Sequence, residues 1–177
     1  QRRRQRQMCI RDRPPTEQNG MQQNSSVKTD SGSSDSSQNE NSRFDALVAD
    51  MKGKKISLSK LREEVFNILL DDAVETPQTD RYYTFEYDPK FRDQLRTWDQ
   101  YPLVYTMEYK KNNLLGANVH HIKGTNSRLK ALNNKRFPKS SYRYYIPKNA
   151  DRIFFEVKES EVQLLSTLPL EKFHFNR

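Results

Sequence analysis

The side chains that could carry chemistry in this sequence are three histidines and a small set of carboxylates. His120 and His121 are adjacent, so on a strand they would face opposite sides and could not bind one metal ion together. Asp88, Asp93 and Asp99 occupy turn and loop positions, where a carboxylate accepts hydrogen bonds from backbone N–H groups. The sequence contains neither a glycine-rich phosphate loop nor a nucleophile elbow. We therefore expect a protein that is not an enzyme, binds no metal or cofactor, and keeps His120 as a hydrogen-bonded core residue.

A basic segment is the one positive signal for function. Residues 123–152 hold nine lysine and arginine side chains and one acidic residue, Asp151. Cations on loops can contact backbone phosphates, and exposed aromatic rings can stack on unpaired bases, which reads charge and shape more than sequence. The candidate nucleic-acid-binding residues are Lys123, Arg128, Lys130, Lys135, Arg136, Lys139, Arg143, Lys148, Arg152, Tyr142 and Tyr144. The alternative is a solvated basic face whose tyrosines pack into the core.

Charge is segregated along the chain, which supports a polyanionic partner for its C-terminal part. Residues 14–80 carry 7 basic and 12 acidic side chains, whereas residues 81–177 carry 18 basic and 10 acidic ones. No apolar run approaches the roughly 18 residues that a membrane span needs, so no membrane partner is expected.

The first 42 residues are expected to be a disordered tail, because residues 14–42 have almost nothing to bury. Met8–Arg13 looks like the translation of a transposon end used in sequencing libraries, and we expect residues 1–13 to be an assembly artefact. A natural arginine-rich leader is the alternative. Without Cys9, the only cysteine, the chain has no disulfide and no thiolate chemistry.

Helical periodicity dominates residues 43–80. Apolar side chains share one face of a helix predicted over Arg43–Met51, which Gly53 would end. A stronger helix follows Ser57 or Ser59, either of which could cap it, and it must end before Thr76-Pro77.

From residue 81 onward the period changes to two, which predicts strands. The first runs through Tyr83, Phe85 and Tyr87. Tyr101–Tyr109 and Leu114–Ile122 form a hairpin across the polar residues 110–113. Gly116 inside the second of these strands indicates a bulge or a close backbone approach.

The remainder alternates short strands and short helices. We expect a loop over Gly124–Asn134 with a short helix at Arg128–Leu132, and strands at Tyr142–Ile146 and Arg152–Lys158. A final helix over Glu161–Ser166 would be capped by Ser160. The predicted fold class is α+β: N-terminal helices, then a small, mainly antiparallel sheet or open barrel with a short C-terminal helix. The predicted domains are a helical segment at 43–80 and a β-rich domain at 81–177 that carries the basic arm 123–152.

Four motifs occur in an order that resembles a known protein family. They are Tyr87-Asp88-Pro89-Lys90, Trp98-Asp99-Gln100-Tyr101-Pro102-Leu103-Val104, Leu115-Gly116-Ala117-Asn118-Val119-His120 and Leu168-Pro169-Leu170-Glu171-Lys172-Phe173. Together they resemble a block shared by the DNA end protector proteins of T4-like bacteriophages.

The resemblance implies a virion protein that binds the double-stranded ends of the packaged genome and shields them from host exonuclease. It would reside in the head or neck of the virion, pass through the host cytoplasm during assembly, and meet other virion proteins there, as a monomer or an oligomer. Two other hypotheses stay open. One is a structural head or neck completion protein that makes protein–protein contacts, and the other is a single-stranded nucleic-acid binder.

Overall fold

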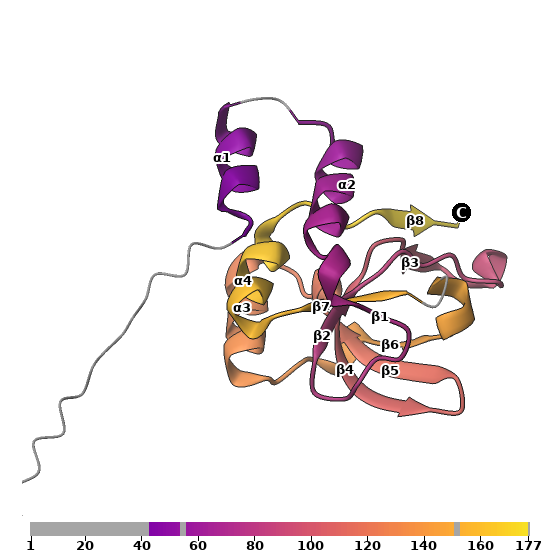
Figure 1. Ribbon diagram of the computed structural model, residues 1–177. Coiled ribbons are helices and arrows are strands. Elements are labelled where there is room, and N and C mark those ends of the chain that lie inside the picture. The colour runs from indigo at the N-terminus through magenta and orange to yellow at the C-terminus, as the bar shows by residue number, and fades with distance from the viewer. Residues whose placement is uncertain (1–42, 54–55, 151–152, 177) are drawn as a thin grey trace, which may run out of the picture. The chain divides into compact units, whose positions relative to one another are not determined.

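The computed structural model describes residues 43–53, 56–150 and 153–176 (Figure 1). The tail expected over residues 1–42, the artefact expected within it, and Arg152 of the basic arm all lie outside these described residues. Within the described ranges, no helix has both the length and the apolar character that a bilayer span requires.

Two helices open the described chain, α1 (Asp45–Gly53) and α2 (Leu58–Ile68). The Ser57 hydroxyl accepts a hydrogen bond from the Lys60 N–H at 3.2 Å, so Ser57 is the cap of the two serines that the sequence offered. The α-helix ends well before Thr76-Pro77 and continues as a single 3-10 turn, η1 (Leu70–Asp72). Asp71 and Asp72 would oppose the helix dipole if α2 continued through them, and they lie in η1 instead.

The strands form an open antiparallel sheet in the order β1-β7-β2-β4-β5-β6, which confirms the predicted α+β class. Their bounds are β1 Ala73–Val74, β2 Tyr82–Thr84, β4 Leu103–Lys110, β5 Asn113–Asn118, β6 Tyr142–Tyr145 and β7 Phe154–Val157. A separate two-stranded sheet pairs β3 (Thr97–Asp99) with β8 (Phe173–Phe175). Neither strand of this small sheet was predicted, because three residues carry too little periodicity to recognise.

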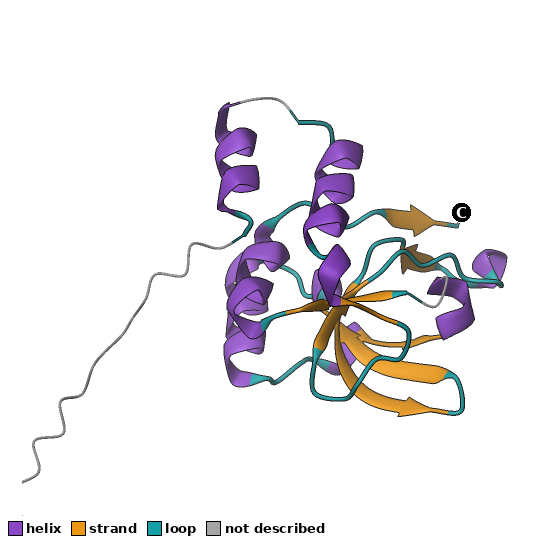
Figure 2. Cartoon of the chain, viewed as in Figure 1, coloured by secondary structure: helices purple, strands orange, loops and turns teal. Residues whose placement is uncertain are grey.

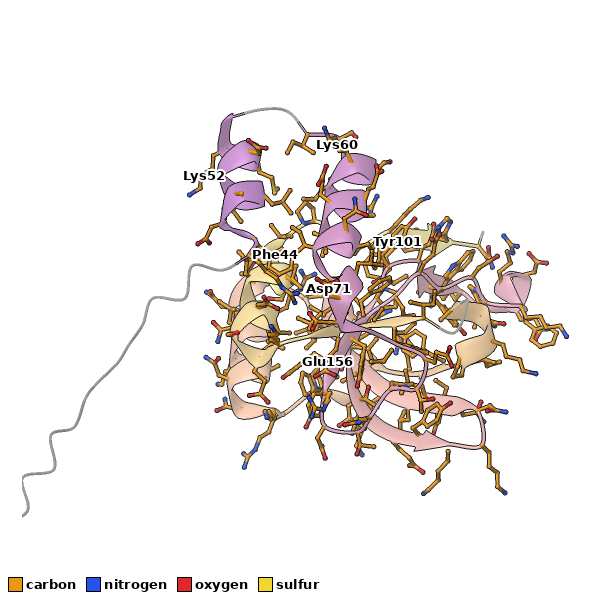
Figure 3. The ribbon with its side chains drawn as sticks, in the orientation of Figure 1. Phe44, Lys52, Lys60, Asp71, Tyr101 and Glu156 are labelled. Atoms are coloured by element: carbon orange, nitrogen blue, oxygen red, sulfur yellow. The ribbon has the colours of Figure 1, made fainter. Side chains whose placement is uncertain are left out.

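Helices cover one face of the large sheet. Two further helices, α3 (Thr125–Asn134) and α4 (Glu159–Thr167), lie side by side at the left of the sheet in Figures 1 and 2. The helix-side core consists mainly of Phe44, Leu47, Leu61, Val65, Leu69, Tyr82, Leu103, Ala117, Leu132, Val162 and Leu165. The helices of residues 43–80 therefore share one hydrophobic core with the sheet. Tyr101, labelled in Figure 3, lies beside α2, where the Arg62 guanidinium is 5.1 Å from its ring centroid.

The opposite face of the sheet carries a smaller aromatic core. Tyr145 of β6 meets Phe85 and Tyr87 edge to face, at ring-centroid distances of 5.3 and 5.0 Å. Phe154 joins them at 4.9 Å from Phe85. Each such pair adds roughly 0.5–1.5 kcal/mol beyond the area that it buries. Tyr145 is a packing residue, and its edge strand β6 is held against the rest of the fold by these rings.

The predicted hairpin is confirmed as β4–β5, with Lys111 and Asn112 at positive φ in its turn. The close approach predicted at Gly116 is confirmed as well, because a Cβ there would lie 2.2 Å from Val104 Cγ1. The register of the hairpin also shifts after Thr106, directly opposite Gly116.

Four element predictions were wrong in extent. The strand through Tyr83 stops at Thr84. β5 ends at Asn118, because the Asn118 side chain accepts the His120 N–H at 2.9 Å and starts a 3-10 turn, η3 (Val119–His121). The segment expected to be mostly loop is helical throughout α3. The last helix begins at Glu159 after Lys158, so Ser160 is not its cap.

Candidate nucleic-acid interface

Asp99 is the point where the motifs of the sequence converge. Its Oδ2 lies 2.7 Å from His120 Nδ1, and both side chains are almost fully buried. Its Oδ1 accepts the backbone N–H of Tyr101 at 3.1 Å and that of Lys172 at 3.0 Å. One carboxylate therefore ties β3 to η3 and to the C-terminal segment, as expected for a turn aspartate and a hydrogen-bonded His120.

Asp99 remains ionised in this setting. Burial by itself would raise its pKa, but the hydrogen bond and the charge interaction with His120, followed by the two backbone N–H groups, bring the pKa below its ordinary value. His120 Nε2 is buried and has no hydrogen-bond partner among the described residues. An aspartate–histidine pair can orient a general base only if the other ring nitrogen reaches a substrate or nucleophile. This pair therefore positions backbone.

His121 is a neutral, partly buried side chain. Burial, and then the positive charge of Arg143, lower its pKa from 6.5 to about 4. Arg143 Nη2 lies 3.2 Å from His121 Nδ1, so at neutral pH the arginine donates to this nitrogen. The remaining proton of the neutral ring is then carried by Nε2.

Several residues of the predicted basic arm have structural partners. Arg128 donates to the carbonyl oxygens of Ile122 (2.9 Å), Ser166 (3.1 Å) and His120 (3.2 Å), and so joins α3 to α4 and η3. Lys135 pairs with Glu159 of α4. Arg128 therefore holds three segments of the fold together, and the charge of Lys135 is offset by Glu159.

The two tyrosines of the arm face different surroundings. Tyr142 packs against the helix-side core, and its hydroxyl donates to the Phe137 carbonyl at 3.3 Å. Tyr144 is the most exposed large apolar side chain of the described residues, at 74%. Of these two tyrosines, only Tyr144 is therefore available for stacking on a ligand.

The other cations of the arm are open to solvent. These cations are Lys123, Lys130, Arg136, Lys139 and Lys148. Within the part of the chain that the structure describes, their side chains form no ion pair and donate no hydrogen bond. Four of them, Lys123, Lys130, Arg136 and Lys139, lie on α3 or its flanks, and we call them the α3 cations. Lys148 lies in the 3-10 turn η5 (Pro147–Ala150), at the end of β6.

A pocket of about 290 Å³ opens beside β6 and β3. Its apolar walls include Phe91, Leu95, Trp98, Tyr144 and Ile146, of which Phe91 is 56% exposed. The Trp98 ring is held in place by a parallel stack on His174, at 4.5 Å between centroids. Trp98 is therefore packed against a neighbouring ring, whereas Phe91 and Tyr144 are exposed to solvent.

Of the predicted site residues, Arg143 and Tyr144 line this pocket and the α3 cations do not. In Figure 1, α3 lies at the left of the sheet and β3 at the upper right, so the α3 cations lie apart from the pocket beside β3. The sequence reading missed Phe91, Leu95 and Trp98 as site residues. Apolar side chains in the polar, irregular stretch 88–99 were the available signal, because such residues lack an obvious core face.

Comparison with known families now identifies the relatives of this chain. Residues 36–142 match the family described as the phage T4 terminal DNA protecting protein, a match that includes the first three motifs and α3. A search of curated proteins and one of solved structures found no match. Because the match spans more than half of the chain, this protein belongs to the phage T4 terminal DNA protecting protein family.

Proposed function

We propose that this protein binds the ends of linear double-stranded phage DNA and protects them by occupying them, without catalysing a reaction. The DNA end is proposed as the target because the protein belongs to a family of terminal DNA protecting proteins. The observation that carries the proposal is the set of exposed, unpaired cations between residues 123 and 150, a stretch without any acidic residue. Such cations displace counterions from a DNA backbone, and this displacement drives association.

A non-enzymatic mode of action is supported by how the polar groups are used. Asp99 and His120 are the buried acid and base that could be mistaken for a catalytic pair, but their hydrogen bonds hold backbone segments together. Protection then comes from steric exclusion of a nuclease from the terminal nucleotides. The protein would act in the virion head or neck on packaged DNA, alongside other virion proteins.

Salt dependence measures how many cations contact phosphate. If all five exposed arm cations contact DNA, the slope of log K against log salt concentration is about −4 to −5. Removing the four α3 cations should make that slope less steep by about 3 to 4.

The test of this proposal compares ends with interior sites. Fluorescence anisotropy would measure binding to a short blunt duplex, with a covalently closed DNA circle as competitor. The charge-removal variant replaces Lys123, Lys130, Arg136 and Lys139 with Ala. Its matched control removes the same charge from exposed lysines elsewhere, at Lys52, Lys60, Lys158 and Lys172.

We expect wild type and the control to bind the duplex in the presence of the circle, and the α3-cation variant to bind at least tenfold more weakly. An exonuclease digestion of the same duplex should show protection in the same order. Equal loss in both quadruple variants would mean that net charge alone matters. Wild-type affinity in the α3-cation variant would refute a role for these cations.

A further inference from the structure

The pocket beside β6 is lined by exposed aromatic side chains and by a few polar groups. Phe91 and Tyr144 expose more than half of their surface, at 56% and 74%, although both are large and apolar or amphipathic. Side chains of this kind that gather around a concave surface are typical of a binding site. With its volume of about 290 Å³, the pocket is at the small end of the range for small-ligand sites, which begins near 300 Å³.

The polar groups of the pocket favour a ring with hydrogen-bonding edges over a purely apolar ligand. Thr97 Oγ1 is buried and has no hydrogen-bond partner among the described residues. Neutral His121 and Asn149 also line the pocket. A buried hydroxyl without a partner costs free energy that a ligand with donors or acceptors can recover. An aliphatic ligand has no donor or acceptor and would leave the hydroxyl without a partner.

The charge pattern places a neutral group inside the pocket and an anionic group at its edge. Asp99, which is ionised, belongs to the pocket wall and would repel an anion that entered. Lys90 and Arg143 also line the pocket. We call these two residues the rim cations. Among the nearby acids, Asp88 is offset by its pair with Arg92 at 3.2 Å.

A nucleotide at the end of a DNA strand matches this arrangement, because its base is a flat, neutral heteroaromatic ring and its phosphate is an anion. An aromatic side chain can stack on any base, because every base has a π-face. We propose that the pocket takes up the unpaired terminal base of a DNA end, with Tyr144, Phe91 and Trp98 as its stacking surface and the rim cations on the adjoining phosphates. This inference rests on the proposed function and specifies which part of the DNA end is recognised.

The structure of DNA ends explains why such a pocket would distinguish an end from an interior site. A base inside a duplex must be unstacked and unpaired before it can enter a pocket, which costs free energy, whereas an overhanging base avoids that cost. Ends that carry an unpaired nucleotide should therefore bind more tightly than blunt ends. The chemistry of the pocket does not distinguish a 5′ from a 3′ overhang, so both are needed as probes.

The experiment uses the full chain and hairpin duplexes that have a single open end. The probes are a blunt end, a one-nucleotide 5′ or 3′ thymidine overhang, and the same overhangs made abasic, which keep the phosphate and lack the base. Binding is measured by anisotropy of a dye in the hairpin loop. The variants are Tyr144→Ala and Phe91→Ala. Leu70→Ala is the matched control, because Leu70 is a 62% exposed apolar residue outside the pocket.

We expect wild type and Leu70→Ala to prefer at least one thymidine overhang over its abasic counterpart by about tenfold, which corresponds to about 1.4 kcal/mol. Tyr144→Ala and Phe91→Ala should lose most of this preference and keep their affinity for the abasic end. Equal binding of thymidine and abasic overhangs by wild type would overturn the pocket inference, while preference for ends over a closed circle would leave the proposed function standing. No binding to any of these ends would overturn both.

Discussion

Replacing Asp99 with Asn should destabilise the protein by about 2–4 kcal/mol, although the two side chains have nearly the same shape. The carboxylate accepts hydrogen bonds on both oxygens, from His120 Nδ1 on one side and from the Tyr101 and Lys172 backbone N–H groups on the other. A further contact comes from Asn118 Nδ2 at 3.4 Å. An asparagine side chain supplies only one acceptor oxygen, so either orientation presents an N–H₂ group to a donor.

The size of the effect follows from those two orientations. If the amide nitrogen faces His120, the ring must move its proton to Nε2, which is buried without a partner, and this costs about 1–3 kcal/mol in addition to a lost charge-assisted hydrogen bond. If the amide nitrogen faces the other way, two backbone N–H groups lose their acceptor, at about 1–3 kcal/mol each. A loss of this size is a large part of the roughly 5–15 kcal/mol that stabilises a typical domain.

Urea unfolding at pH 7, followed by far-UV circular dichroism and by Trp98 fluorescence, measures this effect. Asp93→Asn is the matched control, because Asp93 is exposed in the 3-10 turn η2 (Arg92–Gln94), and it should change the free energy of unfolding by less than about 0.5 kcal/mol. If Asp99→Asn is as stable as this control, the convergence of segments on Asp99 does not contribute to stability as argued here.

Three further predictions concern other parts of the fold. Gly116→Ala should cost about 1–3 kcal/mol in urea unfolding, because the new Cβ would lie 2.2 Å from Val104 Cγ1. Arg128→Ala should cost about 2–4 kcal/mol in the same assay, since it leaves three carbonyl oxygens without their charged donor. Lys130→Ala, on the same helix, should leave stability unchanged and weaken only DNA binding; equal stability of these two variants would refute the structural role given to the arginine. The free energy of unfolding should fall as the pH decreases from about 6.5 to about 4, because His121 has its pKa lowered to about 4 in the folded protein and takes up its proton more readily when unfolded. His121→Asn should flatten the pH dependence over that range in thermal melts, and an unchanged profile would contradict it.

The sequence by itself determined the elements that depend on neighbouring residues. Two serines before an apolar stripe limited the start of α2 to Ser57 or Ser59, and the structure selects Ser57. Alternation on either side of a polar turn was sufficient for the β4–β5 hairpin. Gly116 was recognised as a close approach because only glycine lacks a Cβ. The order of the motifs identified the family, which the family match confirms.

Only the tertiary structure decided which of the basic and aromatic residues are free to act. Arg128 and Lys130 are both cations of the same short stretch of sequence. The Arg128 side chain donates to three carbonyl oxygens, whereas the Lys130 side chain is exposed to solvent. The Asp99–His120 contact spans 21 positions, and the pocket joins residues 87–99 to residues 143–149. Such sites form where segments that are distant in the sequence pack together. Periodicity and spacing within each segment do not indicate its partner, so they could not reveal these sites.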